Sequence, residues 1–444
     1  MDSPQGEAQG KSQGERPGAQ GPPGGADHAP RESLATIARE WGRIGCIGFG
    51  GPPAHIALLR ALCVDRRKWL SAQEFEDGVA TTNLLPGPAS TQLAIYCAWR
   101  LRGPIGALIG GICFIVPGLI VILAASALFL AAHPPRWVSG AAAGAGAAVP
   151  AVALGAAIGL APASWRRAAG RGPAGRSAAR APGGAREQGA ARGHGTHVRW
   201  VCYLIAGGAA AALIGPFLVL VLVGCGLAEL LVASYPWPSA RPGPSAGPGP
   251  SAGQALLPLL VTAAVPAGGL LSVAWVAFKV GALSYGGGFV IIPLMQHDAV
   301  HTYHWMTSAQ FLSAVAHGQI TPGPVVQTVA VVGYAAAGVG GALLASLVAF
   351  TPSFIFVLAG GPRFDRLRRS ARVQAFLSGA GPAAIGAIAG ATIPLALALS
   401  HLWQLAVLGL AAGWLIALRR GVVSTLLGAA ALGVLAALAG APVG

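Results

Sequence analysis

The tetrapeptide Phe49-Gly50-Gly51-Pro52 and the tripeptide Pro86-Gly87-Pro88 return later in the chain as Tyr285-Gly286-Gly287-Gly288 and Pro322-Gly323-Pro324. Both motifs are shifted by the same 236 positions (285 − 49 = 322 − 86 = 236), and apolar positions between them keep that spacing without a gap. The sequence therefore predicts two copies of one unit, each interrupted by Gly and Pro at matching points. This pattern is typical of transporters whose substrate site lies at the repeat interface.

The composition indicates a membrane protein, because 54% of the residues are hydrophobic, 10% are charged, and Gly and Pro number 66 and 34. Four apolar stretches, 104–132, 137–161, 336–360 and 374–398, are long enough to cross about 30 Å of hydrocarbon. The net charge of +15 comes largely from arginines in loops between apolar stretches. It is better explained by topology than by nucleic acid binding, so we expect an all-α polytopic membrane protein.

The domain organisation follows from composition. Residues 1–32 read as a disordered tail without the apolar core of a cleaved signal peptide. We assign 33–233 to the first copy, with an Arg/Gly-rich cytoplasmic insert at 162–199, and 255–444 to the second copy. Residues 234–254 form a Pro/Gly/Ser linker between them.

Basic residues predict that the two copies have opposite topology. Arg66-Arg67-Lys68, the Arg100/Arg102 pair and the arginines of the insert mark cytoplasmic loops of the first copy, and the matching loops of the second copy lack Lys and Arg. Conversely, the loop that holds Arg136 matches a segment with five arginines, 363–372. The sequence thus predicts inverted repeats, with the apolar stretch near 255–271 as the extra crossing.

One apolar segment of each copy should not cross the membrane. Residues 78–98 lie between two basic loops assigned to the same side, so we expect a re-entrant hairpin that breaks at Pro86-Gly87-Pro88, with 308–334 as its mirror. Unwound backbone at membrane depth is tolerated where it lines a cavity or is buried in protein. The two breaks should therefore meet near the middle of the membrane.

The residues after each break begin a half-helix whose first N–H groups can bind an anion. Arg43 and Lys279 match at the same offset and would supply positive charge, which suits a small tetrahedral oxyanion. The proposed substrate-binding residues are Arg43, Gly50, Gly51, Asn83, Pro86, Gly87, Pro88 and Thr91 in the first copy, and Lys279, Gly286, Gly287, Gln319, Pro322, Gly323, Pro324 and Gln327 in the second.

Candidate proton carriers are Glu40, Glu74 and His317. Simpler interpretations remain: the breaks could serve helix packing, and Arg43 could lie at the membrane interface. His297, His301 and His304 lie around Asp298 in a predicted loop, but their spacing is not that of a closed metal site. We expect no metal and no cofactor, and the absence of GxxxxGK[ST] gives ATP-driven transport no support.

The strings from Gly48 to Ile56, Asn83 to Pro88, Tyr285 to Phe289 and Gln319 to Pro324 resemble the chromate ion transporter family in its long two-domain form. The resemblance covers roughly residues 34–440 apart from the linkers. It implies chromate export across a bacterial plasma membrane, with sulfate as a competitor and chromate resistance as the phenotype.

Three function classes remain after this reading. An oxyanion carrier is favoured by the repeats, the breaks and the paired cations. A carrier of the same architecture for sulfate or an organic anion is the alternative. A membrane-embedded enzyme has less support, because the chain has no GxSxG, no HExxH and no carboxylate pair at useful spacing. Expected partners are the oxyanion and membrane lipid, and the sequence leaves a homodimer open.

Overall fold

The computed structural model describes residues 32–83, 85–131, 133–168, 185–213, 218–234, 269–284, 289–360 and 370–443, with backbone alone for 185–194. This part of the chain is helical and contains no strand. Four of its helices are long and apolar enough to cross a membrane: α4 (Ala89–Phe129), α5 (Arg136–Ala168), α13 (Thr328–Gly360, preceded by the short η5, Val325–Gln327) and α15 (Ala371–Leu397). The predicted all-α polytopic membrane protein is confirmed.

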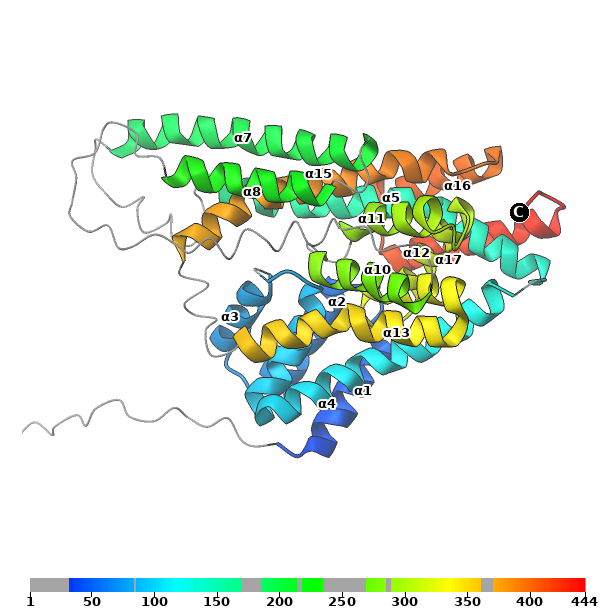
Figure 1. The fold of residues 1–444 in the computed structure, drawn as a ribbon, viewed down its shortest axis with the longest axis horizontal. Coiled ribbons are helices and arrows are strands. Elements are labelled where there is room, and N and C mark those ends of the chain that lie inside the picture. The colour runs from blue at the N-terminus through cyan, green and yellow to red at the C-terminus, as the bar shows by residue number, and fades with distance from the viewer. Residues whose placement is uncertain are drawn as a thin grey trace, which may run out of the picture.

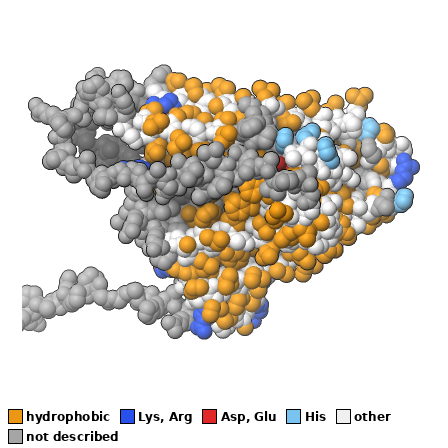
Figure 2. Space-filling view, in the orientation of Figure 1, with side chains coloured by type: hydrophobic (Ala, Val, Ile, Leu, Met, Phe, Trp, Pro, Cys, Tyr) orange, Lys and Arg blue, Asp and Glu red, His pale blue; other side chains and the backbone are white. Residues whose placement is uncertain are grey.

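The surface agrees with a membrane environment. Hydrophobic side chains cover most of the described area of the face in Figure 2, whereas the visible Lys and Arg lie near its margins. Large apolar side chains such as Ile105 and Ile120 on α4 and Leu347 on α13 are 60%, 62% and 69% exposed. Lipid contact satisfies such side chains, which in water would form a large unfavourable patch.

The first part of each half has the same helices at the same spacing. Helix α1 (Leu34–Ile47) matches α10 (Leu270–Leu283), and the π-helical turn η1 (Ala61–Arg66) matches η4 (His297–Thr302), at both ends with an offset of 236. Between them lie α2 (Pro52–Arg60) and α11 (Ile291–Gln296). The prediction of a loop around Asp298 is therefore wrong, because residues 297–302 form a π-helical turn.

Helices α3 (Ala72–Thr82) and α12 (Ser308–Ile320) precede the two breaks and start with the same kind of cap. Ser71 and Glu74 form a capping box at α3, and Thr307 and Gln310 form one at α12. Each box satisfies two backbone N–H groups that the first turn leaves without partners.

After the breaks, α4 and α13 each turn back on themselves. The kink in α4 lies at Arg102-Gly103 and that in α13 at Ala337-Gly338, where both glycines have φ near +60°. The offset here is 235, so one residue fewer separates break and kink in the second half. The segment from Ala89 to the α4 kink spans only about 20 Å at 1.5 Å per residue, which is shorter than the hydrocarbon core, as a re-entrant hairpin requires.

The two halves pack into each other. Helix α5 of the first half packs against α16 (Leu402–Ala412), which continues into η7 (Gly413–Ala417), and α17 (Val422–Leu438) of the second. Helix α15 of the second half packs against α7 (Ala185–Leu213) and α8 (Leu218–Ser234) of the first. Figure 1 shows α7, α8 and α15 together along one edge, with α4, α10 and α13 on the other side of the molecule.

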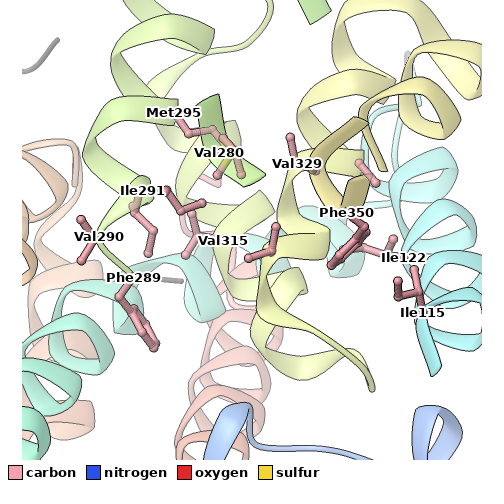
Figure 3. Packing of buried hydrophobic residues seen from close by; sticks show 14 of the residues in the cluster. Ile115, Ile122, Val280, Phe289, Val290, Ile291, Met295, Val315, Val329 and Phe350 are labelled. Atoms are coloured by element: carbon pink, nitrogen blue, oxygen red, sulfur yellow. The ribbon is translucent and has the colours of Figure 1, made fainter. Parts of the chain in front are cut away.

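Small residues permit the closest helix contacts. Gly45 on α1 lies against the carbonyl of Phe114 on α4, and the matching Gly281 on α10 lies against the carbonyl of Ala349 on α13. A Cβ at Gly281 would come within 2.0 Å of that carbonyl oxygen. Around these contacts, Val280, Val315 and Val329 of three different helices and Phe350 with Ile122 fill the core (Figure 3). The packing uses the small-residue interfaces typical of membrane helices.

Several predicted features fall outside the described residues, namely Gly286, Gly287, most of the linker 234–254, residues 255–268 and Arg363 to Arg369. The predicted insert 162–199 is helical at both ends, because α5 continues to Ala168 and α7 begins at Ala185.

Candidate functional site

The first break lies between α3 and α4. Helix α3 is capped by Asn83, the chain turns at Pro86-Gly87-Pro88, and α4 starts at Ala89 with Pro88 as its N-cap. Gly87 has φ +123°, which side chains rarely adopt, so this position requires glycine. Its N–H donates a 2.6 Å hydrogen bond to the carbonyl of Ser284, at the end of α10 in the other half.

The second break makes the mirror-image bond. Gly323, with φ +96°, donates its N–H to the carbonyl of Gly48 at 3.0 Å. Gly87 and Gly323 are 236 positions apart, as are Gly48 and Ser284. Each break is therefore held by the residue that caps the C-terminus of the first helix of the opposite half, Ser284 of α10 or Gly48 of α1. The two breaks thus form one interlocked unit.

Buried polar side chains surround the first break without being satisfied. The hydroxyls of Thr91, Ser284 and Ser353 are on fully buried residues and have no hydrogen-bond partner among the described residues. Ser353 is adjacent to the break, since its Oγ lies 3.3 Å from where a Cβ on Gly87 would be. Buried polar groups are almost always paired, so this cluster indicates a site for a ligand that supplies the missing partners.

Gln92 closes the first break from inside α4. Its side-chain Nε2 donates to the Pro86 carbonyl at 2.6 Å, and its Oε1 has no partner among the described residues. The amide holds the turn and leaves the first N–H groups of α4 directed at the break.

A cavity of about 480 Å³ opens beside the first break. Asn83, Gly87 and Ala89 of the first break line it, and so do Arg166 and Arg167 at the end of α5. The remaining lining residues are Thr82, Leu85, Leu160, Ala163, Val290, Gly381, Ala384, Ile385 and Ile388. The volume lies in the usual range for small-ligand sites, and two arginines with a half-helix N-terminus give it a positive potential.

The second break is closed by packing. Residues 321–330 are all buried, whereas Asn83 and Pro86 of the first break are exposed. The Pro322 carbonyl lies against Gly118, and a Cβ there would approach its oxygen to 2.3 Å. Gln327 donates its Nε2 to the carbonyl of Ile115 at 3.3 Å. Pro324 caps η5, and Gln319 is buried with its Nε2 unpaired among the described residues.

Of the flanking glycines, Gly50 and Gly51 have φ of +95° and +74°. Gly51 is the N-cap of α2, and a Cβ on it would touch the side chain of Val325, just after the second break. The nearby His55 is fully buried, with Nε2 2.9 Å from the Gly48 carbonyl oxygen, to which it donates. These contacts place the first Gly-Gly motif at the second break.

The two matched cations have different surroundings. Lys279 is buried and forms an ion pair with Asp298, whereas Arg43 is exposed on α1. The sequence analysis did not assign Asp298 as the partner of Lys279. Asp298 lies on η4, and only the folding of the chain brings its carboxylate next to Lys279 on α10.

Glu40 and Glu74, the acidic candidates for proton transfer, are held by arginines. Burial raises the pKa of Glu40. The hydrogen bond from Arg67 at 2.7 Å and the charge of Arg66 outweigh burial, so the pKa lies below its usual value. Burial likewise raises the pKa of Glu74, and hydrogen bonds from Ser71 with the charge of Arg100 outweigh it, so this pKa is also lowered. Both carboxylates are thus ionised at neutral pH.

His317 lies on α12 before the second break. Its Nδ1–H donates to the Ser313 carbonyl at 2.6 Å, and its ring is tilted against Phe129 with centroids 5.1 Å apart. The side chain therefore has a defined tautomer.

In the part of the chain that the structure describes, no three His, Cys, Asp or Glu side chains are grouped to hold a metal ion.

Sequence analysis missed Ser284, Ser353, Arg166 and Arg167 as site residues. The repeat contains a signal for one of them: Pro352-Ser353 matches Pro117-Gly118 at the offset of 235. Gly118 contacts the second break and Ser353 the first. The arginines had been interpreted as a topological signal alone.

Comparison with known proteins places the chain in a family. The family model described as "Chromate transporter" matches residues 35–230 and 271–438. The chain is 30% identical over 382 residues to the "Chromate transport protein" of Cupriavidus metallidurans, covering 84% of this chain and 85% of that protein. It is 27% identical to the "Probable chromate transport protein" of Synechococcus elongatus (82% and 85% covered) and 29% identical to the "Chromate transport protein" of Pseudomonas aeruginosa (83% and 82% covered).

No solved structure matches this chain. The family model covers both halves of the chain on either side of residues 231–270. Together with the coverage of these relatives, this match shows that the chain belongs to the chromate transporter family.

Proposed function

We propose that this protein is a secondary transporter that exports chromate across a bacterial plasma membrane and thereby confers chromate resistance. The observation that carries the proposal is the first break, where the N-terminus of a half-helix borders a cavity that Arg166 and Arg167 also line. Three buried hydroxyls close to this break are unpaired among the described residues. The names of the relatives supply the anion: two of them are called "Chromate transport protein" and a third "Probable chromate transport protein".

The arrangement supports alternating access about interlocked repeats of inverted topology. The cavity reaches the first break from the side of Arg166 and Arg167, which the positive-inside rule assigns to the cytoplasm. The second break is sealed by packing of Pro322 on Gly118 and of Val325 on Gly51. This conformation corresponds to an inward-open state, in which a cytoplasmic oxyanion enters, and export requires the cavity to close while the second break opens.

The candidate substrate contacts are drawn from the residues of the two breaks, with Lys279 and Arg43 as cations, and the cavity reaches the first of these breaks. Lys279 becomes available to the anion when its pair with Asp298 opens. Glu40 and Glu74 are poor proton carriers because arginines keep them ionised, so His317 is the remaining candidate among the three.

The membrane potential favours export. A dianion that leaves a cytoplasm negative inside gains about 2 × 2.3, or roughly 4.6 kcal/mol per 100 mV. Facilitated exit or exchange would therefore suffice, and no nucleotide or cofactor is needed.

A carrier of the same architecture for sulfate or another anion is the second candidate. Hydroxyl and backbone N–H donors do not distinguish chromate from sulfate by charge or geometry, since both are tetrahedral dianions. An enzymatic role has less support, because the relatives are named transporters.

The test is uptake of radiolabelled chromate into inside-out vesicles that contain the protein, with and without excess sulfate. The potential and the pH gradient are collapsed separately. Saturable uptake suppressed by sulfate supports the proposal and identifies the driving force. Uptake no greater than in empty vesicles, with the protein inserted, would overturn chromate export and favour another substrate.

A further inference from the structure

The two breaks are related by the repeat, but their surroundings differ in chemistry. At the first break, Ser284 supplies the carbonyl that holds Gly87, and Ser353 lies beside the glycine. Their counterparts at the second break are Gly48 and Gly118, which have no hydroxyl. Because the residue types themselves differ between the two breaks, a change of conformation does not remove this difference.

Unpaired buried hydroxyls follow the same division, whereas the unpaired atoms near the second break are amide atoms, Nε2 of Gln319 and Oε1 of Gln327. Ser284 and Ser353 are fully buried with hydroxyls unpaired among the described residues, as is Thr91 two residues into α4. At the second break, the Gly48 carbonyl already accepts from both Gly323 and His55. Each unpaired hydroxyl can donate to an anion, and a hydrogen bond to a charged group is stronger than one between neutral groups.

Access differs in the same sense. Asn83 and Pro86 are exposed and the 480 Å³ cavity reaches Gly87. At the second break the residues are buried, with Pro322 against Gly118 and Val325 against Gly51. Where the first break has room for a ligand, the second has backbone packed on backbone.

We infer that each chain binds a single oxyanion, at the first break, where the hydroxyls of Thr91, Ser284 and Ser353 hold it. The second break is a structural mirror that closes the pathway and does not bind substrate. Ser284 and Ser353 come from the second half, so the site is shared between the halves although it lies at one break. The inference rests on the proposed oxyanion transport and assigns specificity to two serines outside the repeated motifs.

The experiment measures equilibrium binding of radiolabelled chromate to the purified full-length protein in detergent. The expected stoichiometry is one anion per chain. Ser353→Ala and Thr91→Val each weaken binding roughly tenfold, the loss of one hydrogen bond to a charged group. Ser346→Ala, a buried serine on the same helix as Ser353, is the matched control and leaves binding unchanged.

The second break is tested with Thr321→Val, which removes a buried hydroxyl next to Pro322. Unchanged affinity supports the inference. Two anions per chain, or an equal loss of affinity in Thr321→Val, would overturn it. If the folded, monodisperse wild-type protein binds neither chromate nor sulfate, the proposed function itself fails and the site fails with it. Thermal unfolding of every variant identifies losses caused by misfolding.

Discussion

The ammonium of Lys279 lies 2.5 Å from the carboxylate of Asp298, and the two side chains are only 10% and 7% exposed. The matched positions of the first half hold no such pair. The matching positions are Arg43, which is exposed, and Leu62, which is buried among apolar side chains (279 − 236 = 43; 298 − 236 = 62). A buried charge is costly unless it is paired, so the second half depends on both partners.

We expect Lys279→Ala to lower the free energy of unfolding by about 3–5 kcal/mol, because Asp298 is left buried without a counter-charge. The double variant Lys279→Met with Asp298→Leu should recover most of this loss. Denaturant unfolding in detergent measures both. Arg43→Ala, an exposed site, should change stability by less than about 0.5 kcal/mol. A double variant as unstable as the single one would contradict the pairing.

The same variants address the substrate role of Lys279. If Lys279 contributes to oxyanion transport, the stable double variant inserts normally and its export falls. Wild-type export in that variant would leave Lys279 with a structural role alone.

Arg166 and Arg167 should concentrate the anion at the cavity. We expect Arg166→Gln with Arg167→Gln to raise the KM for chromate several-fold at low salt with little change in kcat, because uniform electrostatic attraction is lost. The effect should shrink as ionic strength rises, since added salt screens exposed charges. Arg136→Gln, at the other end of α5, is the matched control. An equal rise in KM for Arg136→Gln would indicate a general effect of net charge.

The close approach of α4 to the second break should tolerate no side chain. Gly118→Ala would bring a Cβ to 2.3 Å from the Pro322 oxygen, and we expect about 1–3 kcal/mol of destabilisation with impaired transport. Gly340→Ala is the control, because a Cβ there meets no described atom within 4 Å. Ala favours a helix over Gly, so this variant should be neutral or slightly more stable. Thermal unfolding and vesicle uptake compare the two, and equal effects would argue against the contact.

The sequence repeat predicted where the helices break, because Gly and Pro act on the local backbone and their positions are visible without a fold. The repeat also contains the signal for the capping boxes at Ser71 and Thr307, which the sequence analysis did not predict. The pairing of Gly87 with Ser284 could not be predicted, since it depends on how one half is rotated onto the other. Asp298 was misjudged for a related reason: its surroundings suggested a loop, and a π-helical turn directs it toward Lys279 instead.

The pKa of Glu74 predicts a pH dependence of stability. Because this pKa is lowered in the folded state, its contribution to stability is present above the unfolded value of about 4.3 and is lost as pH falls through the folded pKa. Glutamine can keep the capping box, as Gln310 does at α12, so Glu74→Gln removes mainly the charge paired with Arg100. We expect this variant to be less stable than wild type by up to about 1 kcal/mol at neutral pH, and the difference to shrink as pH falls below about 4.3. Glu76→Gln, in an exposed pair with Arg60, should have little effect. Unfolding curves across pH measure the difference, and a gap that does not shrink on acidification would contradict the assignment.

The proposed opposite topology of the two halves predicts that matched positions are exposed on opposite sides of the membrane. Asp65 and His301 are 236 residues apart, both exposed, and at equivalent places in η1 and η4. In a background without the native cysteines, Asp65→Cys should react with a membrane-impermeant maleimide from the cytoplasmic side and His301→Cys from the outer side. Inside-out and right-side-out vesicles measure the two rates, and permeabilised membranes give the control for total reactivity. Labelling of both positions from one side would mean that the halves are parallel, and the interlocked hydrogen bonds of Gly87 and Gly323 would then need a different symmetry to explain them.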